Sequence, residues 1–264
     1  RLILADDFLL YRGSLADKLK ELFRLIAVLR KERFGLAFIL HRAWQFNVLV
    51  LLTGIPKRVG YSRGSEGIGL TDRVSPAPFR NERESYLDLL RVMGYPAVYE
   101  RSYYYLSNEE DRFLADFLKQ HNIREEDRLI GIGPGGGKNV KTYMPTKRWP
   151  LKNFICLIKN LIDHGYRVVL LGGRDEKPLA ESILSEYPSC LDALHLSYGE
   201  MASVMRRCQL YIGNDSGPLH IADAVGTTTL SLFGPTDPRI QAPLGERSNV
   251  IFKQVECSPC YHDG

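Results

Sequence analysis

The chain has 264 residues, of which 44% are hydrophobic and 25% charged, and its formal net charge is +4. This is the composition of a globular protein with enough apolar residues for one large domain or two of ordinary size. The mild positive charge favours anionic ligands such as nucleotides or phosphorylated glycans. No apolar run approaches the roughly 20 residues that a membrane span needs.

Nucleic-acid binders usually carry a concentrated basic stripe, and this chain does not, so we expect no nucleic-acid partner. The densest basic set surrounds an apolar helix face and is interpreted as a solvated surface: Lys18, Lys20, Arg24, Arg30, Lys31 and Arg33. The chain begins at Arg1 and ends within an expected loop, so we expect both ends to be incomplete.

Five cysteines at scattered spacing argue against a disulfide scaffold and favour a reducing compartment. Cys257 and Cys260 form a C-x-x-C, which is half of a zinc site. No second pair completes four ligands, so two loop thiols are the favoured interpretation and no metal is expected.

Apolar periodicity in the first half predicts alternating helices and strands. Helices are expected at 15–34, 43–55, 82–94 and 107–122, strands at 35–40 and 57–62, and a long Gly- and Pro-rich loop at 63–81. Ser107 and Glu110 form a capping box at the start of the last helix. We place a domain boundary near residues 123–127, giving domains 1–125 and 126–264, the first incomplete at its start.

The second half alternates more regularly. Strands are expected at 128–133, 166–173, 193–197, 209–214, 228–234 and 248–253, and helices at 149–165, 175–187, 199–208 and 216–226. Such alternation implies right-handed crossovers and a parallel sheet with ligands at the carboxyl ends of its strands. The predicted fold class is therefore α/β, with two Rossmann-like domains facing a cleft.

The stretch GIGPGGG places Gly131, Gly133 and Gly136 in the G-x-G-x-x-G spacing of dinucleotide-binding folds. In that fingerprint a helix follows at once, but Pro145 opposes a helix here and the next one starts near Pro150. The fingerprint is therefore rejected. What remains is a glycine-rich strand end before a basic loop suited to phosphate, or else a flexible connector with solvated side chains: Lys138, Lys141, Lys147 and Arg148.

The segment YIGNDSGPLHIADAVG predicts a strand that ends at Asp215 and a helix that begins after it. Ser216 is the expected N-cap and Pro218 lies in the first turn, so this junction would bind an anion such as a diphosphate. With Ser216 as the cap, the Asp215 carboxylate is available for sugar hydroxyls. His220 lies one turn into the helix, where contact with phosphate and simple packing are equally compatible with the sequence. The loop FGPTDP after the next strand would flank the same site.

These motifs, with MPTKRWP, LLGGRDE and the terminal CSPC, are those in which the chain resembles the ADP-heptose:lipopolysaccharide heptosyltransferase family. The likeness is specific in the second half and holds only in outline in the first. It implies the GT-B architecture and inverting transfer of heptose from ADP-heptose to the lipopolysaccharide inner core. The implied donor-binding residues are Lys147, Glu176 (with Asp175 as a close competitor), Asp215, Ser216, Gly217, His220 and, more weakly, Thr142.

The resemblance also implies the partners and the location of the enzyme. The partners are an ADP-sugar donor and a lipopolysaccharide core acceptor, and no cofactor is implied. The enzyme would be cytoplasmic, with contact at the inner face of the inner membrane left open.

One departure concerns the catalytic base, which in the family is an aspartate in a glycine loop after the first strand. RLILADDFLLYRGS does not match that opening, and nothing places Asp6 or Asp7 in such a loop, so no base is named. No D-x-D occurs, so lysine and a helix N-terminus would carry the diphosphate charge without a metal. Two alternatives stay open: a nucleotide-sugar epimerase of similar fold, and a non-catalytic sugar-nucleotide-binding module.

Overall fold

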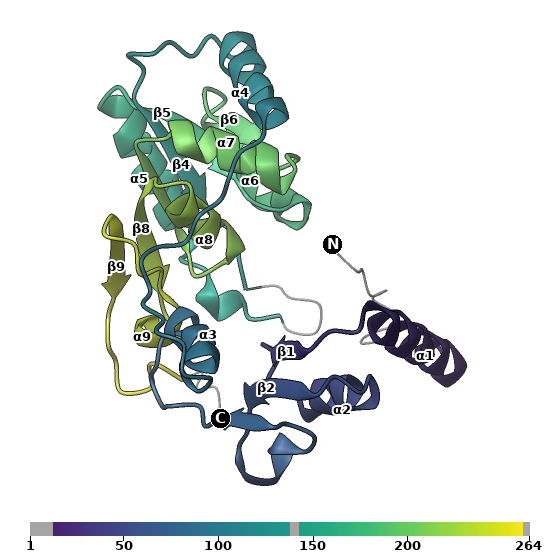
Figure 1. Cartoon of the computed structure of the whole chain (residues 1–264). Coiled ribbons are helices and arrows are strands. Elements are labelled where there is room, and N and C mark those ends of the chain that lie inside the picture. The colour runs from purple at the N-terminus through teal and green to yellow at the C-terminus, as the bar shows by residue number, and fades with distance from the viewer. Residues whose placement is uncertain (1–12, 138–142, 261–264) are drawn as a thin grey trace. The chain divides into compact units, whose positions relative to one another are not determined.

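The computed structural model describes residues 13–137 and 143–260 (Figure 1). The chain divides into two compact units, Arg1–Tyr99 and Glu100–Gly264. The division falls ahead of the boundary predicted near residue 125. Helix α4 (Asn108–Gln120) accounts for the difference, because it packs on α7 (Tyr198–Arg207) of the second unit.

The first unit is a small parallel α/β sheet with the strand order β1-β2-β3. Its strands are β1 (Leu36–Ile39), β2 (Lys57–Tyr61) and β3 (Asp72–Val74), and its helices are α1 (Leu15–Glu32), α2 (Trp44–Leu52) and α3 (Glu82–Arg91). Val59 and Tyr61 of β2 pack with Leu89 of α3 in a small apolar cluster.

One expectation for this unit was wrong. The predicted loop 63–81 contains β3 and a short 3₁₀ turn, η2 (Gly64–Gly67). A strand of three residues has too short a pattern to be recognised by alternation. Helix α1 is present as predicted, with Leu25 and Ile26 as its buried residues, while Leu15 and Phe23 are exposed.

The second unit is a six-stranded parallel sheet with the order β6-β5-β4-β7-β8-β9. Its strands are β4 (Leu129–Gly133), β5 (Arg167–Leu171), β6 (Leu191–Ala193), β7 (Leu210–Asn214), β8 (Thr228–Phe233) and β9 (Ser248–Phe252). Besides α4 and α7, its helices are α5 (Leu151–Asp163), α6 (Lys177–Glu186), α8 (Gly217–Ala224) and α9 (Pro238–Gln241). If these strands are numbered 1 to 6 along the chain, their order across the sheet is 3-2-1-4-5-6, which is the Rossmann arrangement.

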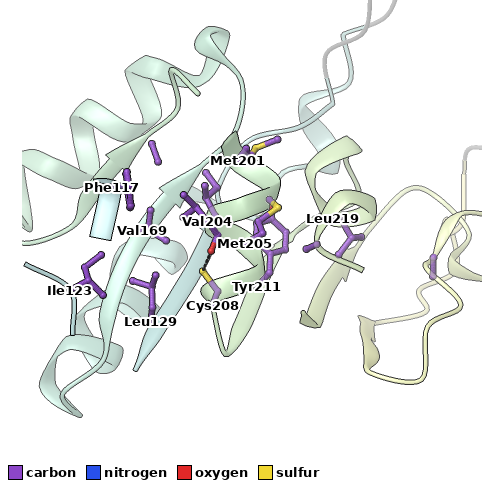
Figure 2. Close-up of a cluster of buried hydrophobic side chains, with 14 of the residues drawn as sticks. Phe117, Ile123, Leu129, Val169, Met201, Val204, Met205, Cys208, Tyr211 and Leu219 are labelled. Atoms are coloured by element: carbon purple, nitrogen blue, oxygen red, sulfur yellow. Dashed lines mark hydrogen bonds between the residues drawn. The ribbon is translucent and has the colours of Figure 1, made fainter. Parts of the chain in front are cut away.

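The sheet has a hydrophobic core on each face because alternate residues of a strand point to opposite sides. Ile130 and Ile132 of β4 belong to the core under α5 and α6. Leu129, by contrast, belongs to the core that includes residues of α4, α7 and α8. Figure 2 shows this second core, in which Tyr211 of β7 lies near Met205 and Leu219. The central strands are therefore buried on both sides, as their continuous apolar sequences predict.

Most predicted elements of the second unit are present, including the capping box of Ser107 and Glu110. The strand expected at 193–197 is instead β6, which ends at Ala193. Its middle residue is Asp192, whose carboxylate accepts the Leu194 amide at 3.1 Å and turns the chain away from the sheet. Helix α9 was not predicted, because four residues are too few for a helical period.

The cysteines provide a test of this core. Burial raises the pKa of Cys190 to about 11 and that of Cys208 to about 12, whereas Cys156, Cys257 and Cys260 are exposed. Because the thiolate is the reactive form, we expect the exposed three to react with DTNB at pH 8 and the buried two to react only after denaturation. Mass spectrometry of peptides alkylated with and without guanidinium would identify the sites. Equal labelling of Cys208 and Cys156 in the native protein would contradict the fold.

Candidate functional site

The strand order changes direction between β4 and β7, which lie side by side at the centre of the second sheet. Successive strands run outward from β4 on one side and from β7 on the other. In open α/β sheets, ligands bind outside the carboxyl ends of the strands at this switch point. The loops that follow β4 and β7 are therefore where a ligand is expected to bind.

The glycine-rich loop Pro134–Gly137 follows β4 directly. Gly136 and Gly137 have φ values of 109° and 76°, a region that side-chain-bearing residues rarely adopt. A Cβ added to Gly135 would lie 1.7 Å from Oε1 of Glu176. Positive φ at Gly136 and Gly137 and the close approach at Gly135 are the reasons why these positions require glycine.

Rejection of the dinucleotide fingerprint is confirmed as well. Gly131 and Gly133 lie inside β4 rather than in a turn, and the first α-helix that the structure describes after them starts at Leu151. Between the loop and that helix the structure describes the 3₁₀ turn η3 (Pro145–Lys147), so Pro145 opens a turn where it was expected to oppose an α-helix.

Glu176 links this loop to the one after β5. Its carboxylate accepts hydrogen bonds from the Gly136 amide and, at 2.9 Å, from the Gly173 amide. A carboxylate offers about four lone-pair positions, so about two remain for other donors such as ribose hydroxyls. Glu176 thus lies against the glycine loop, while its competitor Asp175 is exposed in the turn η4 (Arg174–Glu176).

Lys147 and Asp215, two predicted donor ligands, meet in an ion pair. Lys147 Nζ donates to Asp215 Oδ2 at 2.6 Å, and the side chains are 19% and 6% exposed. Thr236 Oγ1 donates to the same carboxylate oxygen at 2.8 Å. Thr236 belongs to FGPTDP, so this loop flanks the site as predicted. The pair concentrates one positive and one negative charge at the switch point.

Asn214 is a site residue that the sequence analysis missed. Its fully buried side chain accepts the Trp149 amide at 2.9 Å and donates to the carbonyls of Pro134 and Gly135 at 3.2 and 2.8 Å. These bonds connect the end of β7 to the glycine loop and to the start of α5. The signal was available, because Asn214 directly precedes Asp215 in the same motif.

Arg148 also differs from expectation. It was grouped with the loop lysines, as either a phosphate ligand or a solvated side chain, but its Nε donates to the Gly136 carbonyl at 2.7 Å. The guanidinium therefore anchors the glycine loop. Thr142, Lys138 and Lys141 lie outside the described residues.

Helix α8 begins at Gly217, with Ser216 at the N-cap position and Pro218 in the first turn. The prediction that the Ser216 side chain caps the helix was wrong. Its backbone is extended (φ −159°, ψ 166°), and the hydroxyl donates back to the Asn214 carbonyl at 3.2 Å. The first turn of a helix still presents amide groups without intrahelical acceptors, which suits an anion. His220 is half-buried in this turn.

No group of three or more His, Cys, Asp or Glu side chains that could hold a metal occurs within residues 13–137 and 143–260. Cys257 and Cys260 are exposed, and the Cys260 amide donates to the Pro235 carbonyl at 2.9 Å. Over the same described ranges, no helix has the length and apolar character to cross a membrane.

Known proteins are similar to this chain in sequence and in fold. The profile of glycosyltransferase family 9 (heptosyltransferase) matches residues 22–264. Lipooligosaccharide heptosyltransferase 2 of Haemophilus influenzae is 33% identical over 144 residues, which cover 52% of this chain and 40% of that protein. Lipopolysaccharide heptosyltransferase 2 of Escherichia coli is 27% identical over 245 residues, covering 84% and 66% respectively. The chain therefore spans less than about two thirds of the length of these curated relatives.

Among solved structures, that of E. coli ADP-heptose lps heptosyltransferase II is similar with a TM-score of 0.74 and 27% identity, covering 89% of this chain and 73% of the other. Two α/β units with parallel sheets form the GT-B fold in such proteins. The predicted α/β fold class with parallel sheets in two domains is confirmed.

Proposed function

The chain belongs to glycosyltransferase family 9, the heptosyltransferase family, and on that premise we propose that it transfers heptose from ADP-heptose to the lipopolysaccharide inner core with inversion. The observation that carries the proposal is the Lys147–Asp215 pair beside the N-terminus of α8, at the switch point of the second sheet. Relatives named heptosyltransferases support the sugar and the acceptor.

Each residue has a chemical role in this proposal. Lys147 neutralises charge that develops on the departing diphosphate, together with the Ser216 and Gly217 amides at the start of α8. Asp215 accepts hydrogen bonds from heptose hydroxyls, and Glu176 accepts them from the ribose. His220 and Thr142 would contact the phosphates.

The reaction is a single displacement. A base removes the proton of the acceptor hydroxyl, and the oxygen attacks the anomeric carbon from the face opposite the diphosphate. The new C–O bond forms as the bond to the ADP oxygen breaks, which inverts the configuration. We assign the base to no residue of this chain.

The lipid-linked acceptor would bring the enzyme to the inner face of the inner membrane from the cytoplasm. A sedimentation assay with vesicles containing lipopolysaccharide would measure this association.

Donor binding is the first experiment. We expect ADP to raise the melting temperature, because a ligand that binds only the folded state stabilises it by mass action. At 100 times Kd the stabilisation is about 2.7 kcal/mol, which corresponds to roughly 5–10 °C for a domain of this size. NAD is the control, because the rejected fingerprint would bind it. Shifts with NAD and none with ADP would overturn the proposal.

Product analysis then separates the alternatives. Transfer releases ADP only when acceptor is present, and the acceptor gains the mass of one heptose. An epimerase would change ADP-heptose without acceptor and leave a free sugar nucleotide, and a binding module would bind ADP-heptose unchanged. Family membership favours transfer over both.

A further inference from the structure

Tyr211, in the middle of β7, is a fully buried residue to which the proposed function gives no role. Its ring lies in the core face drawn in Figure 2, near Met205 and Leu219. Two residues further along the same strand stands Gly213, followed by Asn214 and Asp215 of the candidate site.

Three glycines form a slot for this ring. A Cβ on Gly131 would lie 3.1 Å from Cδ2, one on Gly213 would lie 2.9 Å from Cε1, and one on Gly133 would lie 1.9 Å from the hydroxyl oxygen. In the sheet register Tyr211 pairs with Gly131, and Gly133 pairs with Gly213. The ring therefore runs along the strands, and its hydroxyl points toward their carboxyl ends, where the candidate site lies.

The hydroxyl at the end of this slot has no hydrogen-bond partner among the described residues. A buried polar group without a partner is unfavourable for folding, and phenylalanine would occupy the same slot without that cost. Packing alone therefore explains the ring but not its oxygen.

Two site residues lie close to this oxygen. Burial raises the pKa of Tyr211 far above its ordinary value, the Glu176 carboxylate raises it further, and a hydrogen-bonding interaction with the Ser216 side chain opposes the rise. Ser216 is therefore within reach of this oxygen, although no hydrogen bond of normal geometry joins the two hydroxyls. Ser216 meanwhile donates to the Asn214 carbonyl over 3.2 Å, which is long for an O–H donor. A rotation about one side-chain torsion of Ser216 would break that weak hydrogen bond and let the hydroxyl donate to another acceptor.

We propose that Tyr211 is a positioning residue of the donor site that acts through Ser216, an inference that rests on the proposed function. When the donor diphosphate binds at the N-terminus of α8, the Ser216 hydroxyl turns from the Asn214 carbonyl to a phosphate oxygen. Its oxygen then accepts a hydrogen bond from the Tyr211 hydroxyl. A hydroxyl that accepts one hydrogen bond donates a stronger one, so the chain tightens binding of the diphosphate.

The test is calorimetric titration of ADP into wild type, Tyr211→Phe, Ser216→Ala and the double variant. We expect Tyr211→Phe to weaken ADP binding roughly 3- to 10-fold, the usual effect of one hydrogen bond. Its melting temperature without ADP should be unchanged or higher, because an unpartnered buried hydroxyl has been removed. The double variant should bind as weakly as Ser216→Ala alone, because the two hydroxyls act as one unit.

Tyr61→Phe is the matched control. Tyr61 is a buried tyrosine of the first unit whose hydroxyl also lacks a partner among the described residues. Removing that hydroxyl should have the same effect on stability as in Tyr211→Phe and none on ADP affinity.

The outcomes distinguish the inference from the function on which it rests. If wild type does not bind ADP, both fall. If wild type binds ADP and Tyr211→Phe binds it equally well, only the inference falls. The inference also fails if the effects of the two substitutions add, or if Tyr211→Phe lowers the melting temperature, since the hydroxyl would then have a structural partner.

Discussion

Replacing Lys147 with alanine is expected to lower kcat for heptose transfer about 30- to 1000-fold while leaving the protein folded. Removing one charged donor from a developing oxyanion costs on the order of 2–4 kcal/mol in transition-state stabilisation. Lys147 is the described lysine that lies against the switch point, paired with Asp215 at 2.6 Å. Measuring ADP release in the presence of acceptor, with circular dichroism on the same sample, would check both parts of the expectation.

Lys152→Ala is the matched control for this prediction. Lys152 is an exposed lysine in the first turn of α5, five residues after Lys147, and has no part in the proposed reaction. Its replacement should leave kcat unchanged. If Lys147→Ala and Lys152→Ala transfer heptose at the same rate, Lys147 pairs with Asp215 for structural reasons and the diphosphate binds elsewhere.

Most of the second unit could be predicted from the sequence because its strands are continuous apolar runs and its helices keep a 3.6-residue period. Strands β4 and β7 are examples, each ending in a glycine-rich or polar junction that marks the carboxyl end. The missed strand β3 and the displaced strand β6 have three residues each and lie at sheet edges. The formation of such short strands depends on pairing with a neighbouring strand, and the local sequence does not show which strand that is.

The site was predictable as a set of residues but not as a set of contacts. Lys147 and Asp215 were each identified from a loop at a strand end, yet their pairing spans 68 positions of the chain. The roles of Asn214 and Arg148 depend on backbone carbonyls of the glycine loop, to which every residue type contributes equally. The residue types in the sequence therefore indicated candidate ligands. The structure was needed to show which side chains bind the glycine-rich loop.

The pairing of Asp215 with Lys147 predicts that Asp215→Asn lowers stability. Asparagine keeps the shape of the side chain but leaves the Lys147 ammonium without its carboxylate, and Thr236 loses a charged acceptor. Losing a hydrogen bond to a charged group costs about 1.5–3 kcal/mol, so we expect a measurable fall in the melting temperature. Lys147→Met combined with Asp215→Asn should recover part of it, because no unpaired charge remains.

Stability alone cannot therefore separate a structural from a ligand-binding carboxylate, but donor binding can. If Asp215 accepts heptose hydroxyls, Asp215→Asn should weaken binding of ADP-heptose roughly 10- to 100-fold and that of ADP, which lacks the sugar, much less. Lys147→Ala should weaken both, since both carry the diphosphate. Asp163→Asn removes the exposed ion pair with Lys159 and should change neither affinity. Equal losses for ADP and ADP-heptose in Asp215→Asn would show that this carboxylate positions Lys147 and does not touch the sugar.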